Sequence, residues 1–216
     1  MNTLLQKAIE EQVGVVEILT GKEALTLIDE QSFQLQWDSL YTSCPWSTVF
    51  QSRAFVYTWY QSYISIYTPV LAVAYQGEKL TGLLTLAQND SGQLVGAGAN
   101  QAEYQVWLAD EQGSSAFIKQ CVISLLKAFP QSEISIKFAP ANTPLQWLDA
   151  EPKWQKICFR RTVRQPLLNL NKENLSQELS KKNRREKLNR LRRQGELSFV
   201  KITDAEEFFA VLDELI

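Results

Sequence analysis

Histidine is absent from this chain of 216 residues. Its absence excludes the Ser-His-Asp and Cys-His nucleophile systems, histidine-ligated zinc and a histidine general base. Any catalysis by this chain would therefore use carboxylates, tyrosine, serine, cysteine or main-chain groups.

Glycine is scarce. The chain has nine glycines and contains neither of the two glycine-rich phosphate-binding patterns, G-x-x-x-x-G-K-[ST] and G-x-G-x-x-G. The nearest segment, Gly96–Ala99, lacks the strand-to-helix context that a phosphate-binding loop requires. We predict that this segment is a loop or the edge of a strand.

Cysteine is also rare in this chain. The three cysteines, Cys44, Cys121 and Cys158, form no C-x-x-C pair, which favours reduced thiols.

No run approaches the roughly 18 apolar residues that a transmembrane helix needs. The first residues carry acids where a signal peptide would be basic. We therefore expect a cytoplasmic protein with no transmembrane segment and no metal ion.

What the chain does contain is an uneven distribution of charge. Residues Lys153–Lys201 carry 15 Lys and Arg against four Glu, a net charge of +11, whereas the remainder carries 7 basic and 20 acidic groups, a net charge of −13. Three interpretations stay open: a solvated helix without a ligand, contact with an anionic substrate or an acidic domain surface, and sequence-independent binding of nucleic acid. The overall net charge of −2 argues against nucleic acid.

The apolar pattern changes between helical spacing and strand alternation along the chain. Helical spacing predicts helices over about 2–12, 22–40, 52–63, 114–129, 144–150, 179–195 and 204–216, the second interrupted near Gln31. Alternation and β-branched residues predict strands over about 13–19, 69–75, 80–87, 93–95, 104–108, 133–138, 154–159, 162–168 and 197–202. A meander of strands with helices before and after it is typical of an α+β fold.

The leucines of the basic region do not share one helix face. At about 100° per residue, Leu175 and Leu179 lie close together, whereas Leu188 and Leu191 fall on nearly the opposite side. A straight surface helix would keep its leucines on one stripe. Two explanations are open: the helix is kinked near Lys182-Asn183, or it lies between two domains and buries a different face at each end. We expect Asn174 to be its N-cap.

The order of several motifs resembles a known bacterial family. The segments Trp37–Leu40 and Val49–Tyr60 are similar to its W-x-x-L and F-Q-S openings, Leu80–Leu86 to its L-x-G-x-L-P-L strand, Gly96–Tyr104 to its G…Y-x-D segment, and Leu179–Phe199 to its basic helix. The family comprises GNAT-like acyltransferases of the CelD/BcsL type, which are relatives of the FemAB aminoacyltransferases. Gln105-Val106 and Thr85 depart from its pattern.

This resemblance implies a mixed, mostly antiparallel sheet flanked by helices over residues 1–168. Residues 169–216 would then open a second GNAT-like domain with the basic helix, a strand and a helix. The implied function is acyl-CoA-dependent N- or O-acyl transfer to a sugar or amino acceptor in cell-surface polysaccharide biosynthesis. Most of the second half would be missing, so we expect a fragment, whose unfinished core could make it associate with itself.

The resemblance and the residue chemistry together nominate substrate-binding residues. We nominate Tyr104 because we expect it to line a cleft. We also nominate Arg53, Arg184 and Arg185, because guanidinium groups pair with phosphate or carboxylate. Arg53 would lie in the first turn of a helix, an unfavourable position for a cation unless it faces an anion. Glu103 is a candidate base, and the catalytic residues are otherwise unassigned. The alternative is a non-catalytic interaction module whose basic helix binds an acidic partner or nucleic acid.

Overall fold

The computed structural model describes residues 15–164, 171–198 and 200–212. Its contacts divide the chain into two units, Met1–Thr162 (unit 1) and Val163–Ile216 (unit 2). The predicted helix over 2–12 and the predicted domain boundary after residue 168 lie outside the described residues.

Unit 1 is built on a mixed sheet with the strand order β1-β2-β3-β4-β6, in which β5 also pairs with β3. Neighbouring strands are antiparallel except β4 and β6, which are parallel. The strands are β1 Val16–Thr20, β2 Thr68–Gln76, β3 Lys79–Gln88, β4 Leu94–Gly96, β5 Leu108–Ala109 and β6 Ile134–Ser135. With its flanking helices this sheet forms an α+β fold, as predicted.

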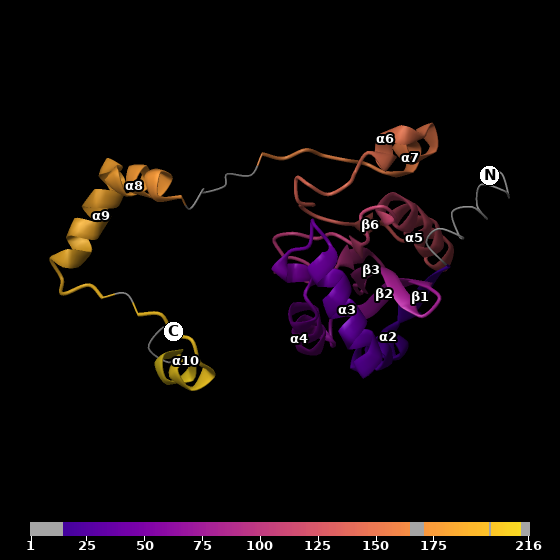
Figure 1. Cartoon of the computed structure of the whole chain (residues 1–216), viewed down its shortest axis with the longest axis horizontal. Coiled ribbons are helices and arrows are strands. Elements are labelled where there is room, and N and C mark those ends of the chain that lie inside the picture. The colour runs from indigo at the N-terminus through magenta and orange to yellow at the C-terminus, as the bar shows by residue number, and fades with distance from the viewer. Residues whose placement is uncertain (1–14, 165–170, 199, 213–216) are drawn as a thin grey trace. The chain divides into compact units, whose positions relative to one another are not determined.

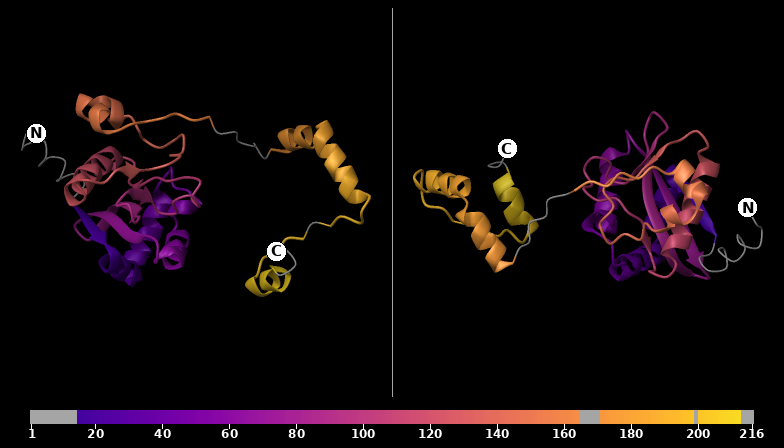
Figure 2. Two further views of the ribbon diagram at one scale, coloured as in Figure 1. Left: turned by 180° about the vertical axis from the view of Figure 1, so that it is seen from behind. Right: turned by 90° about the horizontal axis from the view of Figure 1, so that it is seen from above.

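Helices cover both faces of the sheet, with α2, α3 and α4 on one side and α5 on the other (Figures 1 and 2). They are α2 Gly21–Asp29, α3 Gln31–Ser43, the 3-10 turn η1 Val49–Gln51, α4 Arg53–Tyr63, α5 Ser114–Ala128, α6 Trp147–Ala150 and α7 Pro152–Ile157. The predicted break near Gln31 is confirmed. Ser52 caps α4 by accepting a hydrogen bond from Phe55 N at 3.3 Å, because its hydroxyl can satisfy a first-turn N–H that has no partner within the helix.

The core lies between the sheet and these helices. All six tryptophans are in unit 1 and are at most 6% exposed. The indole of Trp37 donates a hydrogen bond to Gln51 O at 3.0 Å, which satisfies its buried N–H. Gly82 lets α5 approach β3 closely, because a Cβ at this position would lie 2.3 Å from the Phe117 ring.

Two predicted strands are much shorter than expected. Of residues 104–108 only Leu108 is in a strand, and of residues 133–138 only Ile134–Ser135 are. The physical reason is the Gln105 side chain, which hydrogen-bonds to Lys137 N at 2.9 Å and so replaces a strand-to-strand bond. Phe138 then leaves the extended region altogether, with φ 54°.

The predicted strand over 154–159 is wrong, because Pro152–Ile157 form helix α7. Proline at the start of a helix is favourable since its missing N–H would have no partner there. The ring of Trp154, which is buried, packs edge-on against Trp147 with centroids 5.1 Å apart. Residues 162–164 are not in a strand either, and 165–168 lie outside the described residues.

Unit 2 contains three helices in its described part, α8 Lys172–Ser180, α9 Lys182–Arg192 and α10 Ala205–Leu212. The single basic helix predicted over 179–195 is thus broken at Lys181, which has an extended ψ of 134°. Asn171, not Asn174, is the N-cap of α8, accepting a hydrogen bond from Asn174 N at 2.8 Å. The described part of 197–202 contains no strand.

Candidate functional site

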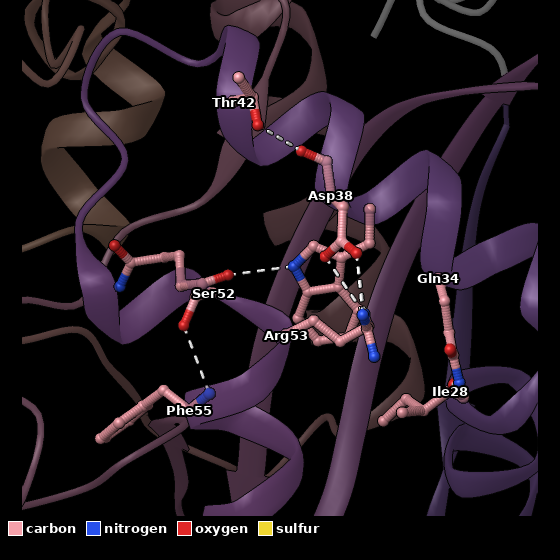
Figure 3. Close-up of polar contacts among 9 residues, drawn as sticks. Ile28, Gln34, Asp38, Thr42, Ser52, Arg53 and Phe55 are labelled. Carbon is pink, nitrogen blue, oxygen red and sulfur yellow. Dashed lines mark hydrogen bonds and ion pairs between the residues drawn. The ribbon is translucent and has the colours of Figure 1, made fainter. Parts of the chain in front are cut away.

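Arg53, nominated as a substrate-binding residue, forms a two-pronged ion pair with Asp38 of the same chain (Figure 3). Its Nε lies 3.1 Å from Asp38 Oδ1 and its Nη2 lies 2.9 Å from Oδ2. Hydrogen bonding to Asp38 raises the pKa of the Arg53 guanidinium. The carboxylate therefore supplies the negative charge that a cation at the start of α4 requires, and the pair ties α4 to α3.

Tyr104 is half-buried and packs against η1. Its ring centroid lies 6.4 Å from that of Phe50, which in turn lies 5.1 Å from that of Phe55. The carbonyl of Tyr104 accepts a hydrogen bond from Gln51 Nε2 at 3.0 Å. Glu103, the candidate base beside it, is exposed to solvent. Tyr104 is thus fixed through its main chain and its ring.

Gln105 is not among the residues nominated from the sequence, yet it is the most completely bonded polar residue of this region and is 3% exposed. Its Nε2 donates to Ala99 O at 2.8 Å, its Oε1 accepts from Lys137 N, and its own N–H donates to Lys137 O at 3.0 Å. The strands β4 and β6 pair at only two positions, Leu94–Ile134 and Val95–Ser135. Beyond them, Gln105 bridges the continuations of the two strands. The sequence feature that could have identified Gln105 is its position as a polar residue directly before the apolar run 106–109.

A shallow recess next to Gln105 leaves no enclosed space that a water molecule could occupy. It is lined by Gln51, Leu84, Thr85, Gly96, Ala97, Gln105, Val106 and Ile136. Pockets for drug-sized ligands occupy about 300–1,000 Å³, and a Cβ on Gly96 would already lie 2.6 Å from the Gln105 side chain. The residues at this end of the parallel pair therefore do not fit an acyl-CoA molecule.

Arg184 and Arg185, the other two nominated residues, lie on α9 in unit 2 and differ in their partners. Arg184 Nη2 lies 3.2 Å from Glu178 Oε2, and Lys181 pairs with the other oxygen of the same carboxylate. The bond from Lys181, and secondarily the charge of Arg184, lowers the pKa of Glu178. Arg185 is exposed and has no ion pair with any described residue.

Four cations of α9 form what we call the α9 cationic surface: Arg185, Lys187, Arg190 and Arg192. All four are exposed, and none forms an ion pair within the part of the chain that the structure describes. Of the three acids nearest in sequence, Glu178 is engaged by Lys181 and Arg184, and Glu186 by Lys182 at 3.9 Å. The third, Glu196, forms no ion pair with any of these four cations in the described part of the chain. This surface is therefore available to an external anion.

Residues 15–164, 171–198 and 200–212 contain neither a metal-binding cluster nor a membrane-spanning helix. No group of three or more His, Cys, Asp or Glu side chains is placed to hold a metal ion. No helix in these ranges combines the length and the apolar character needed to cross a membrane.

Comparison with known proteins gives no further guide. No protein-family model matches the sequence, and no curated protein or solved structure matches it significantly. We therefore infer the function from the geometry above and from the motif resemblance.

Proposed function

We propose that the protein takes part in acyl-CoA-dependent N- or O-acyl transfer to a sugar or amino acceptor in cell-surface polysaccharide biosynthesis, in the cytoplasm. The observation that carries the proposal is the mixed sheet of unit 1. An antiparallel meander ends in one parallel pair, β4 and β6, with α5 lying between these strands in the chain order. This is the mixed, mostly antiparallel sheet flanked by helices that the GNAT-like resemblance implies.

The chemistry is compatible with a chain that has no histidine. An acceptor amine or hydroxyl would attack the acyl carbonyl of the thioester, hydrogen-bond donors would stabilise the developing oxyanion, and a carboxylate, tyrosine or water would take the proton. The C–S bond of the thioester would then break, and coenzyme A would leave as the thiolate and take up a proton. The acyl-CoA thioester supplies the activated carbonyl. Because Gln105 fills the end of the parallel pair, we assign unit 1 a scaffold role and do not place the donor there.

Deletion of the gene in the organism that carries it tests this function. We expect fewer acyl groups on the surface polysaccharide, measured as acid released by mild alkaline and acid hydrolysis, and recovery when the gene is restored on a plasmid. Unchanged acyl content of every surface polysaccharide would contradict the proposal. Fractionation of the same cells tests the cytoplasmic location.

A second candidate function is favoured by the α9 cationic surface. We propose as the alternative a non-catalytic module that binds an acidic partner or nucleic acid through this surface. Calorimetric titration with a short DNA duplex over a salt series separates the two functions. Binding that weakens steeply with salt, by a log–log slope of about 0.9 for each phosphate contact, supports the alternative, and the absence of heat at low salt removes nucleic acid as the partner.

A further inference from the structure

The charges of the α9 cationic surface surround the helix. At about 100° per residue, Arg185 and Arg192 project about 20° apart, whereas Arg190 projects about 140° from Arg185. Side chains on opposite sides of a helix do not converge on one small ligand. A flat membrane surface would reach only one side, and the apolar strip of Leu188 and Leu191 is too narrow for an interfacial helix. The arrangement favours a flexible, extended polyanion.

Neutral polar groups accompany these cations. Asn183 and Asn189 lie on α9 and Gln194 follows it, and each amide both donates and accepts hydrogen bonds. Such groups suit the hydroxyls of a sugar. Residues 171–198 contain no aromatic side chain, so the stacking platform that single-stranded nucleic acids use is missing from this segment.

The net charge of the chain distinguishes between polyanions by charge density. Proteins that bind a dense polyanion such as nucleic acid are usually basic over the whole domain, whereas this chain has a net charge of −2. Duplex DNA carries one charge for about every 1.7 Å of its axis. A polysaccharide with one carboxylate per sugar is much less densely charged, so a local basic surface such as that of α9 is enough to contact it.

We infer that the α9 cationic surface binds an acidic polysaccharide, whose carboxylates pair with Arg185, Lys187, Arg190 and Arg192. Guanidinium groups are suited to this role because they bind carboxylates with two parallel hydrogen bonds. One part of this inference rests on the proposed function, namely that the bound polysaccharide is the acceptor for acyl transfer. The binding itself needs no acyl donor.

The test is calorimetric titration of the full chain with polygalacturonate, with neutral dextran and a 20-base-pair DNA duplex as comparison ligands. One variant carries Arg185→Gln, Arg190→Gln and Arg192→Gln. The matched control carries Lys22→Gln, Lys127→Gln and Lys156→Gln, which remove three exposed charges from unit 1. Both variants have the same net charge, and tryptophan fluorescence and circular dichroism check their folding.

We expect polygalacturonate to bind, dextran not to bind, and the α9 variant to lose affinity about tenfold or more, as three surface charge contacts would give. The control should stay within about threefold of the parent chain, and the salt dependence should become shallower only in the α9 variant. Failure of polygalacturonate to bind at low salt, equal loss in both variants, equal binding of dextran, or tighter binding of the duplex would each overturn the inference.

The outcome is separable from that of the gene deletion. If polygalacturonate binds through α9 while the surface polysaccharide keeps its acyl groups, only the acyl-transfer proposal fails. If acyl groups are lost while polygalacturonate does not bind, only the acidic acceptor is wrong.

Discussion

Helices α4 and α9 are both 11 residues long, yet they are stabilised by different means. Helix α4 buries Val56, Trp59 and Tyr60 in the core of unit 1, whereas α9 buries none of its residues. Isolated helices shorter than about 12–15 residues are marginal in water, and most helical stability in proteins comes from packing. Among the described residues, α9 is supported by ion pairs and hydrogen bonds to nearby positions in the sequence and not by a buried face.

The two units also differ in whether their charged and polar side chains have partners within the chain. In unit 1 the polar groups near the nominated residues are occupied: Arg53 by Asp38, and Gln105 by Ala99 and Lys137. In unit 2 the four cations of the α9 cationic surface have no acidic partner among the described residues. The polar groups of unit 1 are thus satisfied within the chain, whereas the α9 cationic surface of unit 2 is the part for which we propose contact with an external anion.

The largest effect should come from removing a buried phenylalanine of unit 1, and removal of an exposed phenylalanine of unit 2 is the control. Phe33 is 1% exposed, and we expect Phe33→Ala to lower the free energy of unfolding of unit 1 by about 3–5 kcal/mol. Phe209 on α10 is 65% exposed, and Phe209→Ala should leave that free energy within about 0.5 kcal/mol. Urea unfolding followed by tryptophan fluorescence reports on unit 1 alone, because all six tryptophans lie there.

Gln105 should show the next largest effect. Gln105→Ala removes the partner of the buried Ala99 carbonyl and of the part-buried Lys137 N–H and leaves both unsatisfied, at a cost of about 1–3 kcal/mol. Gln61→Ala, on the exposed side of α4, is the matched control and should change stability by less than about 0.5 kcal/mol. The same urea experiment measures both, and equal stability of the two variants would contradict the bridging role of Gln105.

The ion pair between Asp38 and Arg53 should contribute less, although it joins two helices. Its side chains are 48% and 34% exposed, so solvent screens the attraction. A double-mutant cycle with Asp38→Asn and Arg53→Gln should give a coupling energy of about 0.2–1 kcal/mol. The coupling should shrink in 1 M NaCl, where the screening length is about 3 Å. A coupling above 2 kcal/mol, unchanged by salt, would mean that the pair is not screened as its exposure implies.

The elements predicted correctly from the sequence are those whose local pattern and tertiary packing agree. The β2–β3 hairpin has an apolar run on each side of Gln76–Lys79, and both strands are buried. Helix α4 combines the Ser52 cap with apolar residues at helical spacing. In such segments the residues that would stabilise the isolated element are also the ones that the core buries.

The incorrect predictions have a common cause in long-range contacts. The alternation of Ile134, Ile136 and Phe138 predicts a long strand. Its neighbour beyond Ser135 is instead Gln105, which bonds to Lys137 with both its side chain and its main-chain N–H from about 30 residues away in sequence. The role of Arg53 likewise depended on Asp38, which precedes it by 15 residues and lies on another helix. No local pattern encodes either contact, so the sequence identified Arg53 as charged without identifying its partner.

The smallest effect concerns Glu178, at the junction of α8 and α9. Its pKa is lowered chiefly by Lys181, so its contribution to helix stability is present above the ordinary glutamate pKa of about 4.3 and is lost as the pH falls through the lowered value. Lys181→Gln should raise the pKa of Glu178 toward its ordinary value, measured by NMR titration of the carboxyl carbon. Lys182→Gln is the control, because Lys182 pairs with Glu186 instead. A Glu178 pKa that responds equally to both substitutions would show that general charge density around α9, not the local contact with Lys181, sets the acid dependence of unit 2.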